Sequence, residues 1–83
     1  MWYIWDRTVD LNGFSADFIL NRNKHLNDEK AIYVCEEDGR IFRIEGKSVL
    51  AKIYNIDANL SDEDFLFVLE EKWNKLINGG NNV

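Results

Sequence analysis

Residues 31–45, AIYVCEEDGRIFRIE, set the architecture that we expect for the whole chain. Apolar residues alternate with polar ones on both sides of the dipeptide Asp38-Gly39. Asp-Gly readily takes the positive φ angles of a two-residue type I′ turn, which joins two antiparallel strands. The pattern therefore predicts a β-hairpin, and this hairpin is the centre of the predicted sheet.

The two-residue turn also predicts which residues pair across the hairpin. Cys35 would face Phe42 and Tyr33 would face Ile44, and since paired residues share a face, these four would line the core. The other face would be half exposed and would carry Ile32, Val34, Ile41, Glu36, Arg43 and Glu45. A slip of one residue would expose Phe42 and bury charged side chains, so we expect a well-specified register.

The N-terminal segment is rich in aromatic and β-branched residues. Residues 2–5, WYIW, have the composition of a strand, and the hairpin is its natural partner. Residues 8–11 are the candidate for a short fourth strand, and Asn12-Gly13 would end the extended region.

Two short helices are expected. Residues 16–24 follow Ser15, a favourable N-cap, and Phe14 and Ile19 have the spacing of a hydrophobic staple. A polar loop would come next, before the hairpin. Residues 49–54 have apolar side chains at positions i, i+1, i+4 and i+5, which indicates a second helix with one apolar face.

The C-terminal helix, residues 62–78, has the strongest signals. Ser61 is the expected N-cap, and three acidic residues load the first turn, where the helix dipole favours negative charge. One broad apolar face would contain Phe65, Leu66, Leu69, Trp73, Leu76 and Ile77. Phe67 lies on the opposite, polar side, so it is a candidate for a partner contact.

These elements predict an α+β fold in a single domain, residues 1–80, with a frayed tail at residues 81–83. The expected sheet is small, three-stranded and mainly antiparallel, with the fourth strand as an alternative. Two to three helices would pack on one face of the sheet, and the C-terminal helix would be the longest. An arrangement with helices on both faces is the open alternative. The order of the strands is not readable.

Composition excludes several classes of protein. The chain has 83 residues and a formal net charge of −5, with no cluster of Lys and Arg large enough to neutralise many phosphates, so direct binding of nucleic acid is disfavoured. The first residues lack the basic region of a signal peptide, and no apolar run is long enough to span a bilayer. The single cysteine, Cys35, suggests a reducing compartment. We expect a cytoplasmic protein with no membrane partner.

No motif for catalysis, metal or cofactor binding is complete. Gly46-Lys47-Ser48 resembles the end of a phosphate-binding loop, but the glycine that should come five residues earlier is Ile41. The one pair able to make a thiolate and a base is Cys35 with His25, and Cys35 is expected to face the core. We therefore expect a protein that is not an enzyme and has no cofactor and no metal site.

The leading hypothesis is a protein-binding module that acts by steric occupancy, with self-association into a homodimer as one form of it. Strand alternation in residues 2–5 must direct two aromatic or apolar side chains away from the core unless both faces of the sheet are covered. Aromatic residues and arginine are common at the centres of protein interfaces. The candidate partner-binding residues are Tyr3, Trp5, Val34, Ile41, Arg43 and Phe67.

The alternative hypothesis is an acidic inhibitor that mimics nucleic acid and blocks the basic groove of a nucleic-acid enzyme. The carboxylates standing in for phosphates would be Glu36, Glu37, Asp38, Asp62, Glu63 and Asp64. Such binding would weaken steeply as salt is added, whereas an aromatic interface would respond little.

Overall fold

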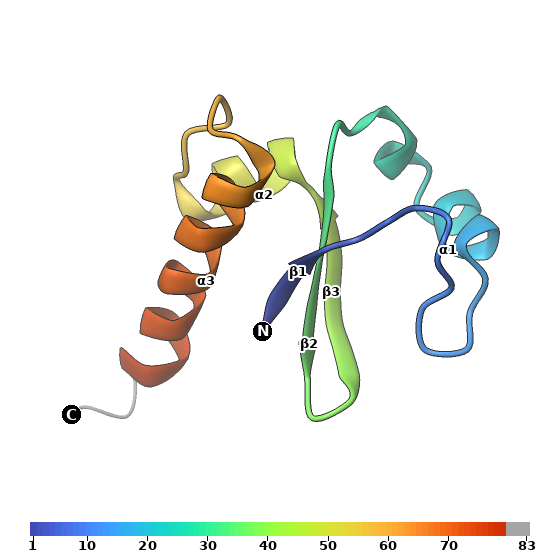
Figure 1. Ribbon diagram of the computed structural model, residues 1–83, viewed down its shortest axis with the longest axis horizontal. Coiled ribbons are helices and arrows are strands. Elements are labelled where there is room, and N and C mark those ends of the chain that lie inside the picture. The colour runs from blue at the N-terminus through green and yellow to red at the C-terminus, as the bar shows by residue number, and fades with distance from the viewer. Residues whose placement is uncertain (80–83) are drawn as a thin grey trace.

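The computed structural model describes residues 1–79, and its centre is a three-stranded antiparallel sheet in the order β1-β2-β3 (Figure 1). The strands are β1 (Trp2–Ile4), β2 (Ile32–Glu37) and β3 (Arg40–Gly46). The helices are α1 (Ala16–Arg22), the short 3₁₀ helix η1 (Lys24–Asp28), α2 (Lys47–Tyr54) and α3 (Asp62–Gly79). The predicted α+β class, the three antiparallel strands and the longest helix at the C-terminus are confirmed. The expected frayed tail, residues 81–83, lies outside the described residues.

Helix ends follow the local signals closely. The Ser15 side chain accepts a hydrogen bond from the Phe18 backbone N–H over 3.1 Å, and the Ser61 side chain accepts one from the Asp64 N–H over 3.2 Å. Asn55 closes α2 in the left-handed conformation, with φ 55°. One difference is that α1 ends at Arg22 and η1 follows, where the sequence predicts a longer helix and then a loop.

Helices cover both faces of the sheet, which corrects the expectation that they pack on one face (Figure 1). The α3-side core consists of Trp2, Ala31, Tyr33, Cys35, Leu50, Ile56, Phe65 and Leu69. The α1-side core consists of Trp5, Leu11, Ala16, Ile19, Leu26, Ile32 and Val34. The physical reason is strand β2, whose first four side chains are apolar and all buried. Because successive side chains point to opposite faces, both faces need a cover.

The hairpin contains a β-bulge that the sequence did not predict. Both turn residues have positive φ, 53° at Asp38 and 76° at Gly39, and this agrees with the expected type I′ turn. Glu36 pairs with Ile41 as predicted, but the register then shifts between Cys35 and Glu36.

Beyond the bulge, Cys35 pairs with Arg43 and Val34 pairs with Ile44. The predicted pairing of Cys35 with Phe42 is therefore wrong. Phe42 is the extra residue of the bulge and is 62% exposed. The shift moves Ile44 to the face of Val34, where it packs against the α1-side core.

The shift also buries Glu45, the outcome that a one-residue slip would produce. The Glu45 carboxylate has three polar partners. It accepts a hydrogen bond from the Gly46 N–H over 2.9 Å, lies 2.8 Å from His25 Nε2 and lies 3.5 Å from Arg43 Nη2. A buried charge is tolerated when it is satisfied in this way. Glu45 thus joins η1 to β3.

The fourth strand does not form in the described part of the chain. Leu11 and Phe14 exchange two backbone hydrogen bonds, at 2.9 and 2.8 Å, around Asn12 and Gly13, both of which have positive φ. This isolated bridge leads directly into α1, and it places Leu11 in the α1-side core.

Candidate protein-binding groove

The six candidate partner-binding residues lie in different environments. Trp5 is 4% exposed and Val34 is fully buried, so neither is available to a partner, and their assignment to a binding surface is corrected. Both belong to the α1-side core, which exists because the sheet is covered on both faces. The Trp5 indole N–H donates to the Val9 carbonyl oxygen over 2.8 Å, so its one polar group is also satisfied.

The other four candidates are at least partly accessible. Tyr3 is half-buried and its hydroxyl donates to a Glu36 carboxylate oxygen over 3.3 Å. Phe67 is 67% exposed on α3. Ile41 and Arg43 both lie on β3, where Ile41 is half-buried and Arg43 is exposed. The structure brings Tyr3 and Ile41 to the α1-side core, whereas Arg43 pairs with Cys35 and so lies on the α3 side of the sheet.

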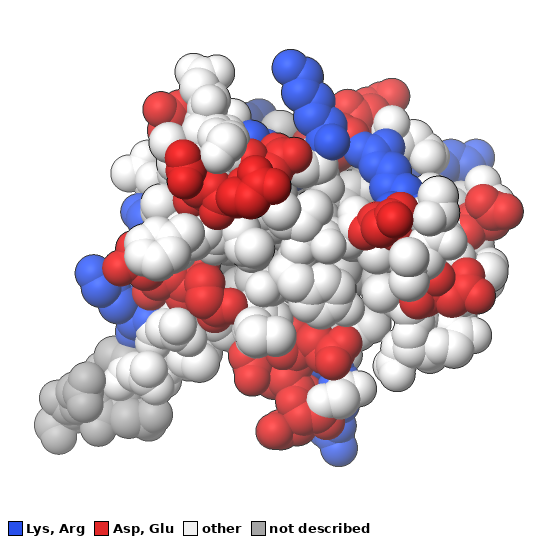
Figure 2. Space-filling view, in the orientation of Figure 1, with Lys and Arg blue, Asp and Glu red and all other residues white. Residues whose placement is uncertain are grey.

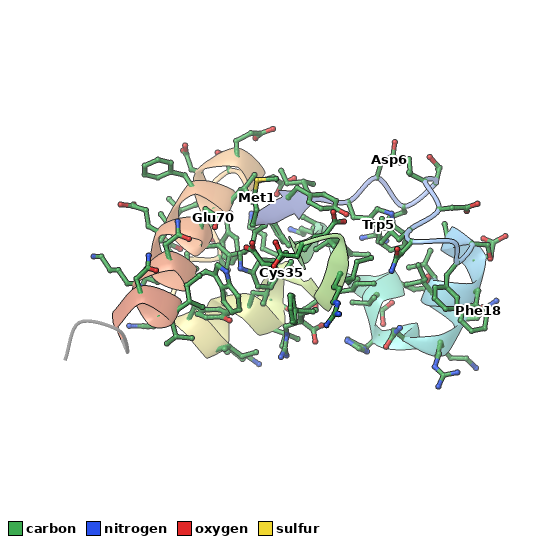
Figure 3. The ribbon with its side chains drawn as sticks, turned by 90° about the horizontal axis from the view of Figure 1, so that it is seen from below. Met1, Trp5, Asp6, Phe18, Cys35 and Glu70 are labelled. Carbon is green, nitrogen blue, oxygen red and sulfur yellow. The ribbon has the colours of Figure 1, made fainter. Side chains whose placement is uncertain are left out.

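An open apolar groove of about 490 Å³ runs between α1 and β3, and we call it the α1–β3 groove. Its walls come from α1, from the bridge before it and from one face of β3. The lining residues are Leu11, Asn12, Phe14, Phe18, Ile19, Arg22, Asn23, Ile41 and Ile44. Figure 3 shows Phe18 at the α1 end of the molecule, far from Glu70 on α3.

Two phenylalanines form one wall of the α1–β3 groove. The rings of Phe14 and Phe18 stack with centroids 5.5 Å apart, and the side chains are 54% and 47% exposed. The Arg22 guanidinium lies 6.0 Å from the centre of the Phe18 ring. Large aromatic side chains that remain exposed next to a groove are typical of interaction sites. Phe14 was expected to pack on Ile19, five residues further along the chain, and its ring stacks on Phe18, four residues further along. The sequence therefore predicted that Phe14 packs onto the first turn of α1 but named a different partner.

The groove is bordered by a free strand edge. Backbone groups of Glu36 and Ile32 bond to Met1 and Trp5, so they point toward β1. Because these groups alternate along a strand, those of Cys35 point toward β3 and meet its partner Arg43. The next residue of β3, Ile44, therefore directs its N–H and carbonyl groups away from the sheet.

The charges around the groove differ from those of the chain as a whole. Arg22 is the only ionisable residue of the lining, in a chain with 15 acidic and 10 basic residues. Arg40 and Arg43 are exposed on β3, but Arg43 lies on the α3 side of the sheet, opposite to the groove. Arg43 Nη2 lies 3.5 Å from Glu45 Oε2 in a salt bridge, and the Arg43 side chain remains 45% exposed.

The predicted acidic patch is divided into two groups. Glu36, Glu37 and Asp38 lie at the hairpin turn, whereas α3 begins near the other end of the sheet (Figure 1). Several of these carboxylates are already engaged. Glu37 contacts the Met1 amino group, and Asp62 lies 3.1 Å from Lys47 Nζ.

The Gly46-Lys47-Ser48 segment binds a carboxylate of the chain itself. A second hollow, of about 310 Å³, lies there. Glu29 accepts hydrogen bonds from the backbone N–H of Ser48, over 3.0 Å, and from its hydroxyl. An anion therefore already lies at the start of α2, and Lys47 points away to Leu60 and Asp62. This arrangement does not favour a phosphate site.

Cys35 and His25 are not brought together. Cys35 is fully buried, and burial raises the pKa of its thiol, whereas His25 is bound to Glu45. Among residues 1–79, no group of three or more His, Cys, Asp or Glu side chains is placed to hold a metal ion. In the same range, no helix combines the length and the apolar character that crossing a bilayer requires.

Comparisons of the chain with protein-family models, with curated proteins and with solved structures find no match.

Proposed function

We propose that this protein is a non-enzymatic protein-binding module, which holds an apolar segment of a partner protein in the α1–β3 groove and acts by steric occupancy. The observation that carries the proposal is the stacked pair Phe14 and Phe18, half exposed beside an open apolar groove. Because the two rings pack against each other, little side-chain order has to be gained on binding. The single buried thiol of Cys35 supports a cytoplasmic setting.

The energy available in the groove suits a real but modest affinity. Burial of a large apolar side chain contributes roughly 1.5–3 kcal/mol. Three partner side chains seated against Phe14, Phe18 and Ile41 would contribute at most about 9 kcal/mol, and association costs at least about 4 kcal/mol. The apolar contacts alone therefore give a dissociation constant of roughly 0.2 mM at best, and polar contacts have to supply any tighter binding.

The test is a selection of random peptides, displayed on phage, against the immobilised protein. We expect selected peptides to bind the Phe18→Ala variant about tenfold more weakly, which corresponds to about 1.4 kcal/mol. The Phe67→Ala variant is the matched control, because Phe67 is an exposed phenylalanine on another helix. Peptides that lose affinity for Phe67→Ala and keep it for Phe18→Ala would contradict the proposal.

Self-association is tested on the protein alone. Sedimentation equilibrium of the wild type and of Phe18→Ala measures the mass over a range of concentrations. A dimer that dissociates in Phe18→Ala would make a second copy the partner. A monomer at all concentrations would leave only a different protein as the partner.

An acidic inhibitor is the second candidate, and the charge distribution favours it. In Figure 2, Asp and Glu side chains gather in several groups around an uncharged centre on one face of the molecule. A basic surface would be attracted to that face. This candidate predicts a partner that is released at high salt and is retained by Phe18→Ala, whereas neutralising Glu36 and Glu37 to Gln would weaken binding.

A further inference from the structure

We propose that the segment bound in the α1–β3 groove is an extended strand with alternating apolar and acidic residues, which adds to the free edge of β3. This inference rests on the proposed function. It names the conformation and the charge of the partner segment, neither of which follows from an apolar groove alone.

The two edges of the sheet differ in how far the chain covers them. On β1, the Trp2 backbone N–H donates to Glu70 Oε1 of α3 over 2.6 Å, and the Trp2 ring packs edge-on against Trp73 with centroids 6.1 Å apart. Helix α3 therefore blocks that edge. On β3, the N–H and carbonyl groups of Ile44 point outward beside the α1–β3 groove. An unpaired strand edge is a template for another strand.

The open part of the β3 edge is short. The bulge at Phe42 limits it on one side. On the other side, the Gly46 N–H is already bound by the Glu45 carboxylate. Pairing would therefore be centred on Ile44 and would involve only a few residues. Backbone bonds alone would give little affinity, so the side chains of the added strand have to supply the rest.

The two faces of β3 favour different side chains in the added strand. Ile41 and Ile44 line the groove on the α1 side. Arg43 pairs with Cys35, so it lies on the α3 side of the sheet. A neighbouring strand would place alternate residues next to each set, apolar ones in the groove and acidic ones beside Arg43.

A second copy of this chain would offer no free carboxylate to this edge. In an antiparallel pair of β3 strands centred on Ile44, Arg43 would lie opposite Glu45 of the other copy. That carboxylate is already bound by His25 and by the Gly46 N–H. A segment of another protein, with acidic residues at alternate positions, fits the edge better.

The test uses the synthetic peptide Ac-EIEFEVE-NH₂ as the probe, with binding measured by ¹⁵N amide shifts of the labelled full chain. The charge-inverted peptide Ac-KIKFKVK-NH₂ is the first control, and we expect it to bind about tenfold more weakly at low salt. The Arg43→Gln variant should reduce that difference between the two peptides.

A series of singly N-methylated probes tests the strand pairing directly. N-methylation removes one donor and blocks one edge of the added strand, and donors alternate between the two edges. We expect methylation at a central position to abolish binding and methylation at the neighbouring positions to be tolerated. Tolerance at every position, with binding still lost in Phe18→Ala, would overturn strand addition and leave the groove as the site.

Two other outcomes separate a failure of strand addition from a failure of the proposed function. Selected library peptides that bind as helices, together with no shift caused by the acidic probe, would overturn this inference and retain the proposed function. Binding of the probe that is unaffected in Phe18→Ala would overturn both.

Discussion

Tyr33 shows how one side chain links the sheet to a helix. Its ring is fully buried against Phe65, with centroids 5.2 Å apart, and its hydroxyl donates to the Asp62 carbonyl oxygen over 3.0 Å. Burial raises the pKa of Tyr33 far above its usual value of 10.0, and the carboxylates of Asp62 and Glu63 raise it further. The hydroxyl therefore stays protonated in the folded state under conditions in which it ionises in the unfolded chain.

This shift predicts a loss of stability in alkali. Below pH 10 both states keep the proton, and above it only the unfolded state releases it, so the free energy of unfolding falls by up to about 1.4 kcal/mol per pH unit. The variant Tyr33→Phe should flatten this fall while costing about 1 kcal/mol at pH 7 through the lost hydrogen bond. Urea unfolding between pH 7 and 11 measures both effects. An equally steep fall in Tyr33→Phe would show that another group is responsible.

The burial of Cys35 predicts a slow reaction of its thiol. The thiol is fully buried and burial raises its pKa, so it should react with Ellman's reagent far more slowly than a free thiol at pH 8. Addition of denaturant should restore a fast reaction. A fast reaction in the folded protein would place Cys35 at the surface.

Strand β3 is the element whose register local sequence signals are insufficient to predict. The turn at Asp38 and Gly39 and the serine caps depend on neighbouring residues, and the sequence predicted them. The bulge depends on distant ones, because α1 supplies the apolar surface for Ile44 and η1 supplies His25 for Glu45. A pattern confined to the hairpin contains neither partner.

The bulge predicts that Phe42 contributes little to stability. Phe42→Ala should change the free energy of unfolding by less than about 1 kcal/mol, because the side chain is 62% exposed. Phe65→Ala is the matched control, and removal of this fully buried ring should cost about 3–5 kcal/mol. Chemical denaturation compares them. Similar costs for the two variants would support the simple register, in which Phe42 lines the core.

On the scale of the whole molecule, the single sheet is shared by two cores. The sequence predicted the class of fold but placed the helices on one face of the sheet. The reason is that the four consecutive apolar residues of β2 were interpreted as one buried face and one half-exposed face. The same misreading assigned Trp5 and Val34 to a binding surface. The α1–β3 groove could be predicted only in part, since it forms between segments brought together by the α1-side core.

Glu45 is expected to hold the α1 side of the molecule to the sheet. Glu45→Ala would leave the Gly46 N–H without its side-chain acceptor and His25 without its partner, so we expect a loss of about 2–3 kcal/mol. Amide signals of α1 and η1 should shift more than those of α3. The control Glu71→Ala, on the exposed face of α3, should stay within about 0.5 kcal/mol of the wild type. Equal costs would mean that Glu45 has no such role.

The α1–β3 groove is the surface that we propose for partner binding. The most direct measurement is a map of ¹⁵N amide shifts on adding the tightest-binding peptide from the displayed library. Perturbed amides should be confined to α1, the bridge at Leu11 and Phe14, and β3. Perturbations centred on α3 around Phe67, or on the acidic hairpin turn, would contradict the account.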